Sequence, residues 1–175
     1  MVDEMRLRRK VCVLGASGVG KTSLVRRFVE KKFDEDHQRT IGVAISKGTL
    51  TFDEVSLELM LWDYEGAEPG SQYSRSFISG ASGLVFVVDV TRPETLDHLL
   101  EAQVRGRGFT GHRPSVLVAN KIDMTGDFAL TAQQLDEASK QEWFIVHASA
   151  KSGDNVDDAF AKLGQMMLDV RKKSA

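Results

Sequence analysis

Apolar and polar positions follow two alternating periods along this 175-residue chain. Five stretches rich in β-branched and other apolar residues predict strands: 10–15, 55–63, 83–90, 115–121 and 143–149. The middle three are apolar almost throughout, as strands are when both faces of a sheet are covered. Between the strands, apolar residues recur at helical spacing in 21–30, 94–104, 132–140 and 156–170. Strands alternating with helices predict an α/β domain with a mostly parallel sheet.

Two local signals refine this outline. Thr131 and Gln134 have the spacing of a capping box, which predicts a helix starting at residue 132. Residues 47–51 predict a further strand that is joined to 55–63 by a hairpin at Asp53 and Glu54, so one edge strand is antiparallel. The length and the absence of internal repeats predict a single domain spanning 1–175.

Composition changes this picture little. Hydrophobic residues make up 42% of the chain, charged residues 27%, and the net charge is −2, which gives no reason to expect nucleic acid as a partner. The only cysteine, Cys12, excludes an internal disulfide, and its apolar surroundings favour a buried core thiol over a reactive one. No apolar run approaches the ~20 residues of a membrane span. We therefore expect a cytoplasmic protein, and a monomer.

The sequence GASGVGKT at 15–22 fits the pattern GxxxxGK[ST], follows a predicted strand and opens a predicted helix. Glycines let backbone N–H groups converge on phosphate oxygens, Lys21 brings a cation to the outer phosphates, and the Thr22 hydroxyl suits Mg²⁺. A glycine-rich turn without a ligand is the alternative, which the strand–helix context opposes. The candidate phosphate-binding residues are Gly15, Ser17, Gly18, Val19, Gly20, Lys21, Thr22 and Ser23.

The sequence NKID at 120–123, at the end of a predicted strand, indicates which base is bound. The Asp123 carboxylate can accept both the N1–H and the exocyclic amino group of guanine, whereas adenine presents a lone pair and no amino group there. Matched polar contacts of this kind can reject the wrong partner by about 10⁴-fold. By itself the tetrapeptide is an ordinary polar strand end, but together with the phosphate motif it predicts GTP and GDP rather than ATP.

Five motifs together resemble those of small GTPases of the Ras superfamily, and the Rab branch most of all: GASGVGKT, TIG at 40–42, WDYEG at 62–66, NKID, and SAK at 149–151. The resemblance extends from about residue 9 to 170. It implies a three-layer P-loop fold with a six-stranded, mostly parallel sheet, one antiparallel edge strand and five helices. It also implies Mg²⁺, GTP and GDP as ligands.

The resemblance assigns roles around the phosphates. Thr22 and Thr40 would supply hydroxyl ligands to Mg²⁺, and Asp63 would act on the metal through water. Backbone N–H groups of Thr40 and Gly66 would meet the γ-phosphate. With Lys21, these two residues are the catalytic candidates.

The resemblance also assigns residues around the guanine base. Lys121 and Lys151 would lie against the base, and Ala150 would donate its N–H to the guanine oxygen. Phe33 would pack its ring on the base, or else be a core residue at the end of the first helix. The complete set of base-site candidates is Phe33, Asn120, Lys121, Asp123, Ser149, Ala150 and Lys151.

The sequence departs from the family at Ala67, where relatives carry the glutamine that orients the attacking water. Because Ala67 cannot orient water, we expect GTP hydrolysis to be about 10²–10³-fold slower than with a glutamine at this position. Arg39 would supply a positive charge in cis, or be a solvated loop arginine. Glu65 or Glu68 would orient water only if a cation offset repulsion from the phosphate. His37 stands where a tyrosine is common and would cover the phosphates less well.

Three functional hypotheses follow. The first is a GTP/GDP-binding molecular switch with slow, Mg²⁺-dependent intrinsic hydrolysis, completed by an activating partner. The second is a GTP-binding scaffold or interaction subunit with negligible hydrolysis; a third, an ATP-using P-loop enzyme, is opposed by NKID. The resemblance implies that effectors, and activating or exchange proteins, bind at residues 33–43 and 63–77.

Both ends of the sequence are basic. In the implied fold they lie on one side, away from the nucleotide, as a solvated rim or as one positive patch for a partner. The last residues contain no cysteine, so we expect no prenyl anchor in this chain. The basic residues are Arg6, Arg8, Arg9, Lys10, Arg171, Lys172 and Lys173.

Overall fold

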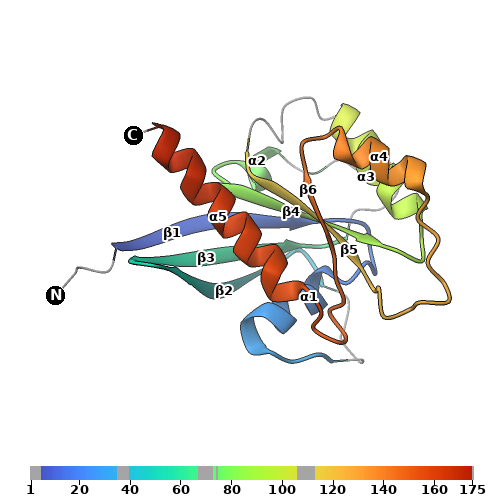
Figure 1. Cartoon of the computed structure of the whole chain (residues 1–175), viewed down its shortest axis with the longest axis horizontal. Coiled ribbons are helices and arrows are strands. Elements are labelled where there is room, and N and C mark those ends of the chain that lie inside the picture. Colours follow the sequence, from blue (N-terminus) through green and yellow to red (C-terminus); the bar gives the residue numbers. More distant parts are fainter. Residues whose placement is uncertain (1–4, 35–39, 67–72, 74, 106–112, 175) are drawn as a thin grey trace.

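Six strands and five helices form the part of the chain that the computed structural model describes, residues 5–34, 40–66, 73, 75–105 and 113–174 (Figure 1). The strands are β1 (Met5–Leu14), β2 (Val43–Phe52), β3 (Val55–Tyr64), β4 (Gly83–Asp89), β5 (Ser115–Asn120) and β6 (Phe144–His147). The helices are α1 (Lys21–Glu30), α2 (Arg75–Ile78), α3 (Glu94–Arg105), α4 (Ala132–Ser139) and α5 (Val156–Ser174).

The strands form one sheet in the order β2-β3-β1-β4-β5-β6. Only the β2–β3 pair is antiparallel, and its two-residue hairpin turns at Asp53, whose φ is 47°. The predicted α/β fold, with its antiparallel edge strand and five helices, is confirmed. The predicted capping box is also present, because Thr131 Oγ1 accepts from Gln134 N while the Gln134 side chain accepts from Thr131 N.

Two strands extend well beyond their predicted bounds, and one short helix was not predicted by the apolar pattern. β1 begins at Met5 rather than residue 10, because its backbone pairs with β3 from Met5 onward while Arg6 and Arg8 stay exposed. An apolar pattern does not reveal such a strand. β2 is likewise longer than 47–51, since its outer residues lie exposed at the edge of the sheet. With four residues, α2 is too short for a helical period to show.

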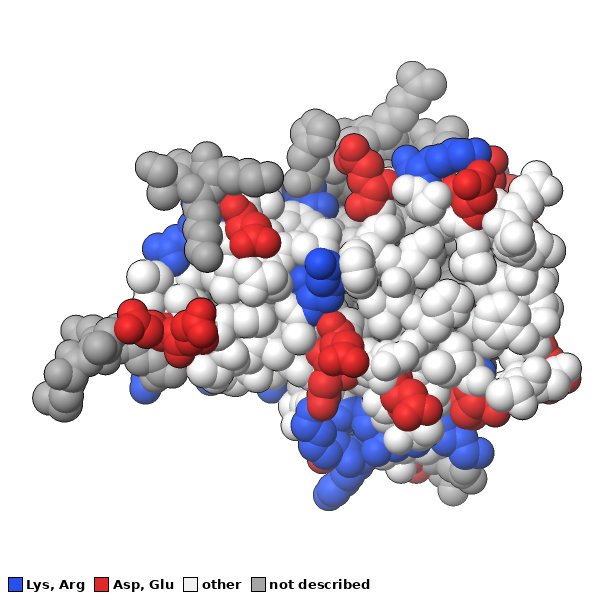
Figure 2. Space-filling model, viewed as in Figure 1, with Lys and Arg blue, Asp and Glu red and all other residues white. Residues whose placement is uncertain are grey.

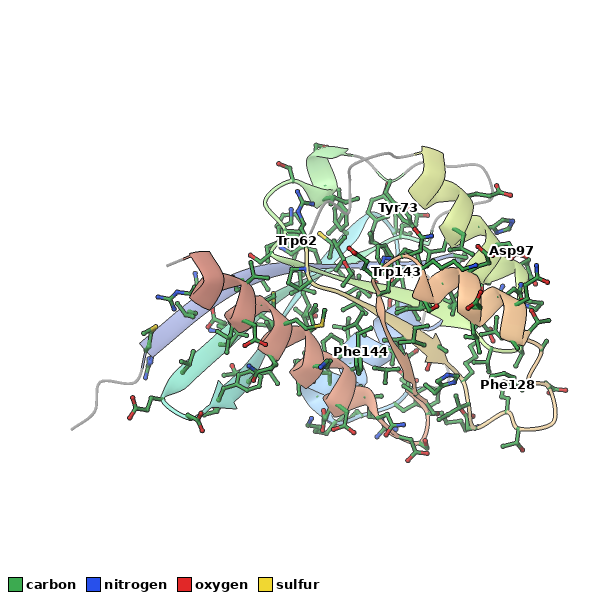
Figure 3. The ribbon with its side chains drawn as sticks, turned by 45° about the horizontal axis from the view of Figure 1, so that its top comes forward. Trp62, Tyr73, Asp97, Phe128, Trp143 and Phe144 are labelled. Carbon is green, nitrogen blue, oxygen red and sulfur yellow. The ribbon has the colours of Figure 1, made fainter. Side chains whose placement is uncertain are left out.

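Helices cover both faces of the sheet, which explains why β4 and β5 are buried throughout. α1 and α5 pack on one face, where the rings of Phe28 and Phe160 stack with centroids 4.2 Å apart. α2, α3 and α4 pack on the other face with Trp62, Tyr73 and Trp143 (Figure 3). The predicted core thiol of Cys12 is fully buried here, and burial raises its pKa to about 11.

The two termini lie at the same end of the molecule (Figure 1), where an Arg171 Nη1 atom is 2.9 Å from Met5 Sδ. The start of β1 and the end of α5 therefore lie on one side of the molecule, as the resemblance implies. On the face shown in Figure 2, basic side chains gather over the end of α1 beside acidic ones, and Lys31 Nζ lies 2.5 Å from Asp157 Oδ1. In the described part of the chain, no helix has the length and apolarity needed to span a membrane.

Candidate nucleotide-binding site

The candidate site lies at the carboxyl-terminal edge of the parallel strands, where loops after β1, β4, β5 and β6 come together. Open α/β sheets bind ligands at this edge. The loop after β1 ends at Gly20, whose φ of 98° is left-handed and favours glycine. A Cβ on Gly20 would lie 2.3 Å from Asn120 Nδ2, so this position also has no room for a side chain.

Lys21, the first residue of α1, is only 6% exposed. Its Nζ donates to the Ala16 carbonyl at 2.9 Å, so the side chain runs back across the loop that precedes its own helix. This brings a positive charge together with the backbone N–H groups at the start of α1. Such an arrangement suits an anion with several oxygens.

Thr22, Thr40 and Asp63 are brought together from α1, the segment before β2, and β3. Thr22 Oγ1 lies 2.7 Å from Thr40 Oγ1 and also hydrogen-bonds to Asp63 Oδ2. Asp63 is 2% exposed. Two hydroxyls and one buried carboxylate are hard oxygen donors of the kind Mg²⁺ takes beside phosphates. The donor set therefore fits the predicted metal, with the three residues already in contact.

Asn120 joins the phosphate loop to the loop after β6. It is 1% exposed, its Nδ2 donates to the Val19 carbonyl at 2.8 Å, and its Oδ1 accepts from Ala150 N at 3.0 Å. The Ala150 N–H, which the resemblance assigns to the guanine oxygen, is thus bonded to Asn120 here. Asn120 fixes both loops against each other and so sets the geometry of the space between them.

That space is a pocket of about 310 Å³. Asp123 stands in its wall, with its Oδ1 accepting from Ser149 Oγ at 2.5 Å. Phe33 packs against the core and also lines the pocket. Met124 is a lining residue that the sequence did not single out. The full lining is Gly18, Gly20, Ser23, Phe33, Asn120, Lys121, Asp123, Met124, Ala150 and Lys151.

Two further side chains that the sequence analysis missed hold this site together. Asp89, at the end of β4, is 1% exposed and its Oδ2 lies 2.6 Å from Lys121 Nζ. Burial raises the pKa of Asp89, but hydrogen bonds from Lys121 and Thr91 outweigh it and keep that pKa below its usual value. Arg27 of α1 donates to the Ala150 carbonyl at 2.8 Å and to the Lys151 carbonyl. A polar residue ending a buried strand was the available signal for Asp89.

The segment after β3 also contacts the phosphate loop. An ideal Cβ on Gly66 would lie 2.3 Å from Ser17 Cα, so only a glycine brings this backbone so close. Glu65 accepts from Gly42 N at 3.2 Å, and its own N–H donates to the Gly42 carbonyl at 2.8 Å. Its carboxylate is thus turned toward Gly42. Tyr73 is 7% exposed, and burial raises its pKa.

Four residues on which the hydrolysis argument depends lie outside the described part of the chain: His37, Arg39, Ala67 and Glu68. The described parts of the predicted partner segments are therefore residues 33–34, 40–43, 63–66, 73 and 75–77. Among these, Ile41 is 88% and Val43 is 41% exposed, which gives this edge an apolar surface.

Comparison with known proteins identifies the family of this chain. The profile of the Ras family matches residues 10–169. Two relatives are Ras-related protein Rab-1 of Theileria parva and of Theileria annulata, each 31% identical over 163 residues that cover 91% of this chain and 74% of the relative. The chain therefore belongs to the Ras family of small GTPases and is similar to its Rab proteins.

Proposed function

We propose that this protein is a molecular switch that binds Mg²⁺·GTP and GDP and hydrolyses GTP slowly. One observation carries the proposal: the glycines of the phosphate loop and the carboxylate of Asp123 line the same pocket. A nucleotide with its phosphates at residues 15–22 would thus present its base to Asp123. The predicted phosphate-binding and base-binding motifs would then serve one nucleotide.

Guanine selectivity would follow from the fixed geometry of the base site. Asp123 would accept the two adjacent guanine N–H groups, and such a pair can favour guanine over adenine by about 10⁴-fold. Lys121 is held by Asp89 and would cover one face of the base. Phe33 and Lys151 line the same pocket and would enclose the base further.

Mg²⁺, when bound beside the phosphates, would offset their negative charge. Thr22 and Thr40 would hold it directly through their hydroxyls, and Asp63 through water. Because Thr22 belongs to α1 and the buried Asp63 to β3, while Thr40 precedes β2, metal and phosphate would hold the 40–42 segment in its place beside Thr22. Thr40 and Gly66 would then respond together to the γ-phosphate.

Hydrolysis would rest on groups that position and neutralise phosphate rather than on a base. Lys21 would stabilise charge on the outer phosphates, while the N–H groups of Thr40 and Gly66 would hold the γ-phosphate. Ala67 offers no group that orients the attacking water, so we expect intrinsic hydrolysis slower by about 10²–10³-fold than with a glutamine there. An activating protein that inserts the missing group would restore the rate.

The partner surface would include the exposed edge at Ile41 and Val43. It adjoins Thr40, and through the Glu65–Gly42 hydrogen bonds it is tied to the segment after β3. Effectors that read both segments would therefore distinguish the GTP form from the GDP form. We expect such partners to be proteins, and the chain itself to act as a cytoplasmic monomer.

The second candidate is a GTP-binding scaffold with negligible hydrolysis, which Ala67 alone favours. Single-turnover hydrolysis of preloaded GTP with Mg²⁺ separates the two candidates. A wild-type rate above that of Lys21→Ala, and a large increase in Ala67→Gln, are expected for a switch. A wild-type rate no higher than that of Lys21→Ala supports the scaffold.

The nucleotide itself is tested by thermal shift with GTP, GDP and ATP. Protection by GTP and GDP but not by ATP is expected. In Asp123→Asn the carboxylate becomes an amide, which cannot accept hydrogen bonds from both guanine N–H groups, so protection by GTP should fall. Protection by xanthosine triphosphate, which has an oxygen in place of the amino group, should rise. Protection by ATP in the wild type would contradict the proposed function.

A further inference from the structure

Arg92 contacts the phosphate loop from outside the predicted motifs. It lies between β4 and α3, and its Nη2 donates to the Ser17 carbonyl at 3.0 Å. Its Nε donates to Asp89 Oδ2 at 3.1 Å. Asp89 is 1% exposed, so one edge of the guanidinium is anchored to a buried carboxylate. The group is therefore held in a defined position, although 39% of the side chain is exposed.

The guanidinium lies beside the part of the phosphate loop that Gly66 approaches. Ser17, which accepts from Arg92, is also the residue that the backbone of Gly66 approaches, with an ideal Gly66 Cβ only 2.3 Å from Ser17 Cα. Gly66 immediately precedes position 67. Arg92 and the glycine assigned to the γ-phosphate therefore meet at the same residue of the loop. An ideal Cβ on Gly18 would lie 3.5 Å from the same Nη2, so the guanidinium extends along the loop.

The charges around Arg92 leave a net positive group at this place. Asp89 contributes one negative charge and contacts both Lys121 and Arg92. Lys121 lines the base pocket, whereas Arg92 points to the phosphate loop. A guanidinium has five N–H donors, and the bonds to Ser17 and Asp89 account for two of them. Donors thus remain for an anion bound by the same loop.

We propose that Arg92 is a catalytic arginine supplied in cis, whose guanidinium stabilises negative charge on the outer phosphates of GTP during hydrolysis. In this step the water oxygen bonds to the γ-phosphorus and its proton ends on inorganic phosphate. The bond from the γ-phosphorus to the β–γ bridging oxygen breaks, and its electron pair stays on that oxygen, which leaves as part of GDP. Arg92 exchanges no proton. This inference rests on the proposed GTP hydrolysis and gives the site a charge that Ala67 cannot provide.

The alternative role of Arg92 is a structural link between the phosphate loop and β4. A structural link would strengthen binding of GDP and GTP alike, because both contact the loop. An arginine that acts on the transition state would raise the hydrolysis rate and the affinity for transition-state analogues while changing GDP affinity little. A structural role would therefore show in GDP affinity, whereas a catalytic role would show in the hydrolysis rate and leave GDP affinity almost unchanged.

The test measures single-turnover GTP hydrolysis, GDP affinity and retention of GDP by aluminium fluoride in wild type, Arg92→Ala and Arg92→Lys. Arginines in this role contribute factors of about 10³–10⁵. We expect at least a ~10²-fold slower rate in Arg92→Ala, with GDP affinity within about threefold of wild type and no aluminium fluoride complex. Arg92→Lys, which keeps the charge and most of the stem, should recover part of the rate and controls for folding.

Arg26→Ala is the matched control, because Arg26 is an exposed arginine whose Nη1 lies 3.5 Å from Asp34 Oδ2. It should leave all three measurements unchanged. If the wild type hydrolyses GTP and Arg92→Ala does so at the same rate, this inference is overturned and the proposed function stays intact. The inference is also overturned if Arg92→Ala loses GDP and GTP affinity equally while the GTP-loaded variant hydrolyses at the wild-type rate. A wild type without hydrolysis and without an aluminium fluoride complex overturns both.

Discussion

The ammonium of Lys121 lies 2.6 Å from the buried carboxylate of Asp89, so the residue that follows Asn120 in the base motif is held by the end of β4. Asp89 also accepts from the backbone N–H of Thr91 at 2.9 Å and from its hydroxyl at 2.7 Å. These bonds fix the carboxylate, and the carboxylate in turn fixes Lys121. Base recognition therefore depends on a residue outside the pocket.

We predict that Asp89→Asn weakens guanine nucleotide binding without touching the nucleotide. The amide cannot pair with the charge of Lys121, which then loses its defined position beside the base. Losing a charge-assisted hydrogen bond of this kind costs about 1.5–3 kcal/mol, or roughly 10–100-fold in affinity. Dissociation of a fluorescent GDP analogue in a stopped-flow experiment measures the change. Asp158→Asn, on the exposed side of α5, is the control and should dissociate like the wild type.

The lowered pKa of Asp89 predicts how the stability of the fold depends on pH. Because the folded-state pKa of Asp89 is below its usual value, its contribution to stability is present above the unfolded pKa of about 4 and is lost as pH falls through the folded pKa. Urea unfolding of wild type and Asp89→Asn should differ by about 1–3 kcal/mol at pH 7. The difference should narrow below about pH 4. A difference that stayed constant down to pH 3 would contradict the assignment.

Close contact between Gly66 and Ser17 predicts a selective effect on the GTP form. In Gly66→Ala the new methyl group would meet Ser17 Cα at 2.3 Å and Ser17 N at 2.5 Å, both of them backbone atoms that cannot turn away. The segment after β3 would then be displaced from the γ-phosphate, whereas groups that hold GDP remain. We expect GTP affinity to fall by at least about tenfold, since one backbone hydrogen bond to a charged group is lost.

Isothermal titration with GDP and with a non-hydrolysable GTP analogue measures this effect in one protein. GDP serves as the internal reference, because a general folding defect would weaken both ligands. Equal affinity losses would contradict the assignment of Gly66 to the γ-phosphate.

Sequence motifs predicted the residues of the site better than the connections between them. GASGVGKT and NKID could be recognised because each motif carries its chemistry within a few consecutive residues. Arg92 bonds to Ser17, 75 positions away, and Arg27 bonds to Ala150, 123 positions away. No local pattern encodes such pairs, since they exist only once the loops at the edge of the sheet have met. The fold class needed only the periodicity of strands and helices.

Strand lengths were less predictable for a different physical reason. The outer parts of β1 and β2 are held by backbone hydrogen bonds to β3, which any side chain permits. In β1 the exposed Arg6 and Arg8 therefore leave no apolar trace of a strand, and in β2 the first three residues are all apolar and all exposed, so they show no alternation. The hairpin at Asp53 was recognised because turn residues have their own local preferences.

The contact of Gly48 with Phe28 predicts a stability effect distant from catalysis. A Cβ on Gly48 of β2 would lie 2.4 Å from Phe28 Cε1, and Phe28 cannot move freely because its ring stacks on Phe160. Overpacking a core in this way costs about 1–3 kcal/mol. We expect Gly48→Ala to lower the free energy of unfolding in urea by that amount. Gly126→Ala, with nothing within 4 Å of its Cβ, should leave it almost unchanged.

A second substitution can show whether the stability lost in Gly48→Ala comes from the clash with Phe28 or from the change within β2 itself. Replacing Phe28 by leucine removes part of the ring that the new methyl group would strike. If overpacking is the cause, Gly48→Ala should cost less in a Phe28→Leu background than in the wild type, and the two changes would not be additive. Additive losses would show instead that the cost arises within β2 itself. The double-mutant cycle thus tests whether α1 and β2 are packed as tightly as the distance implies.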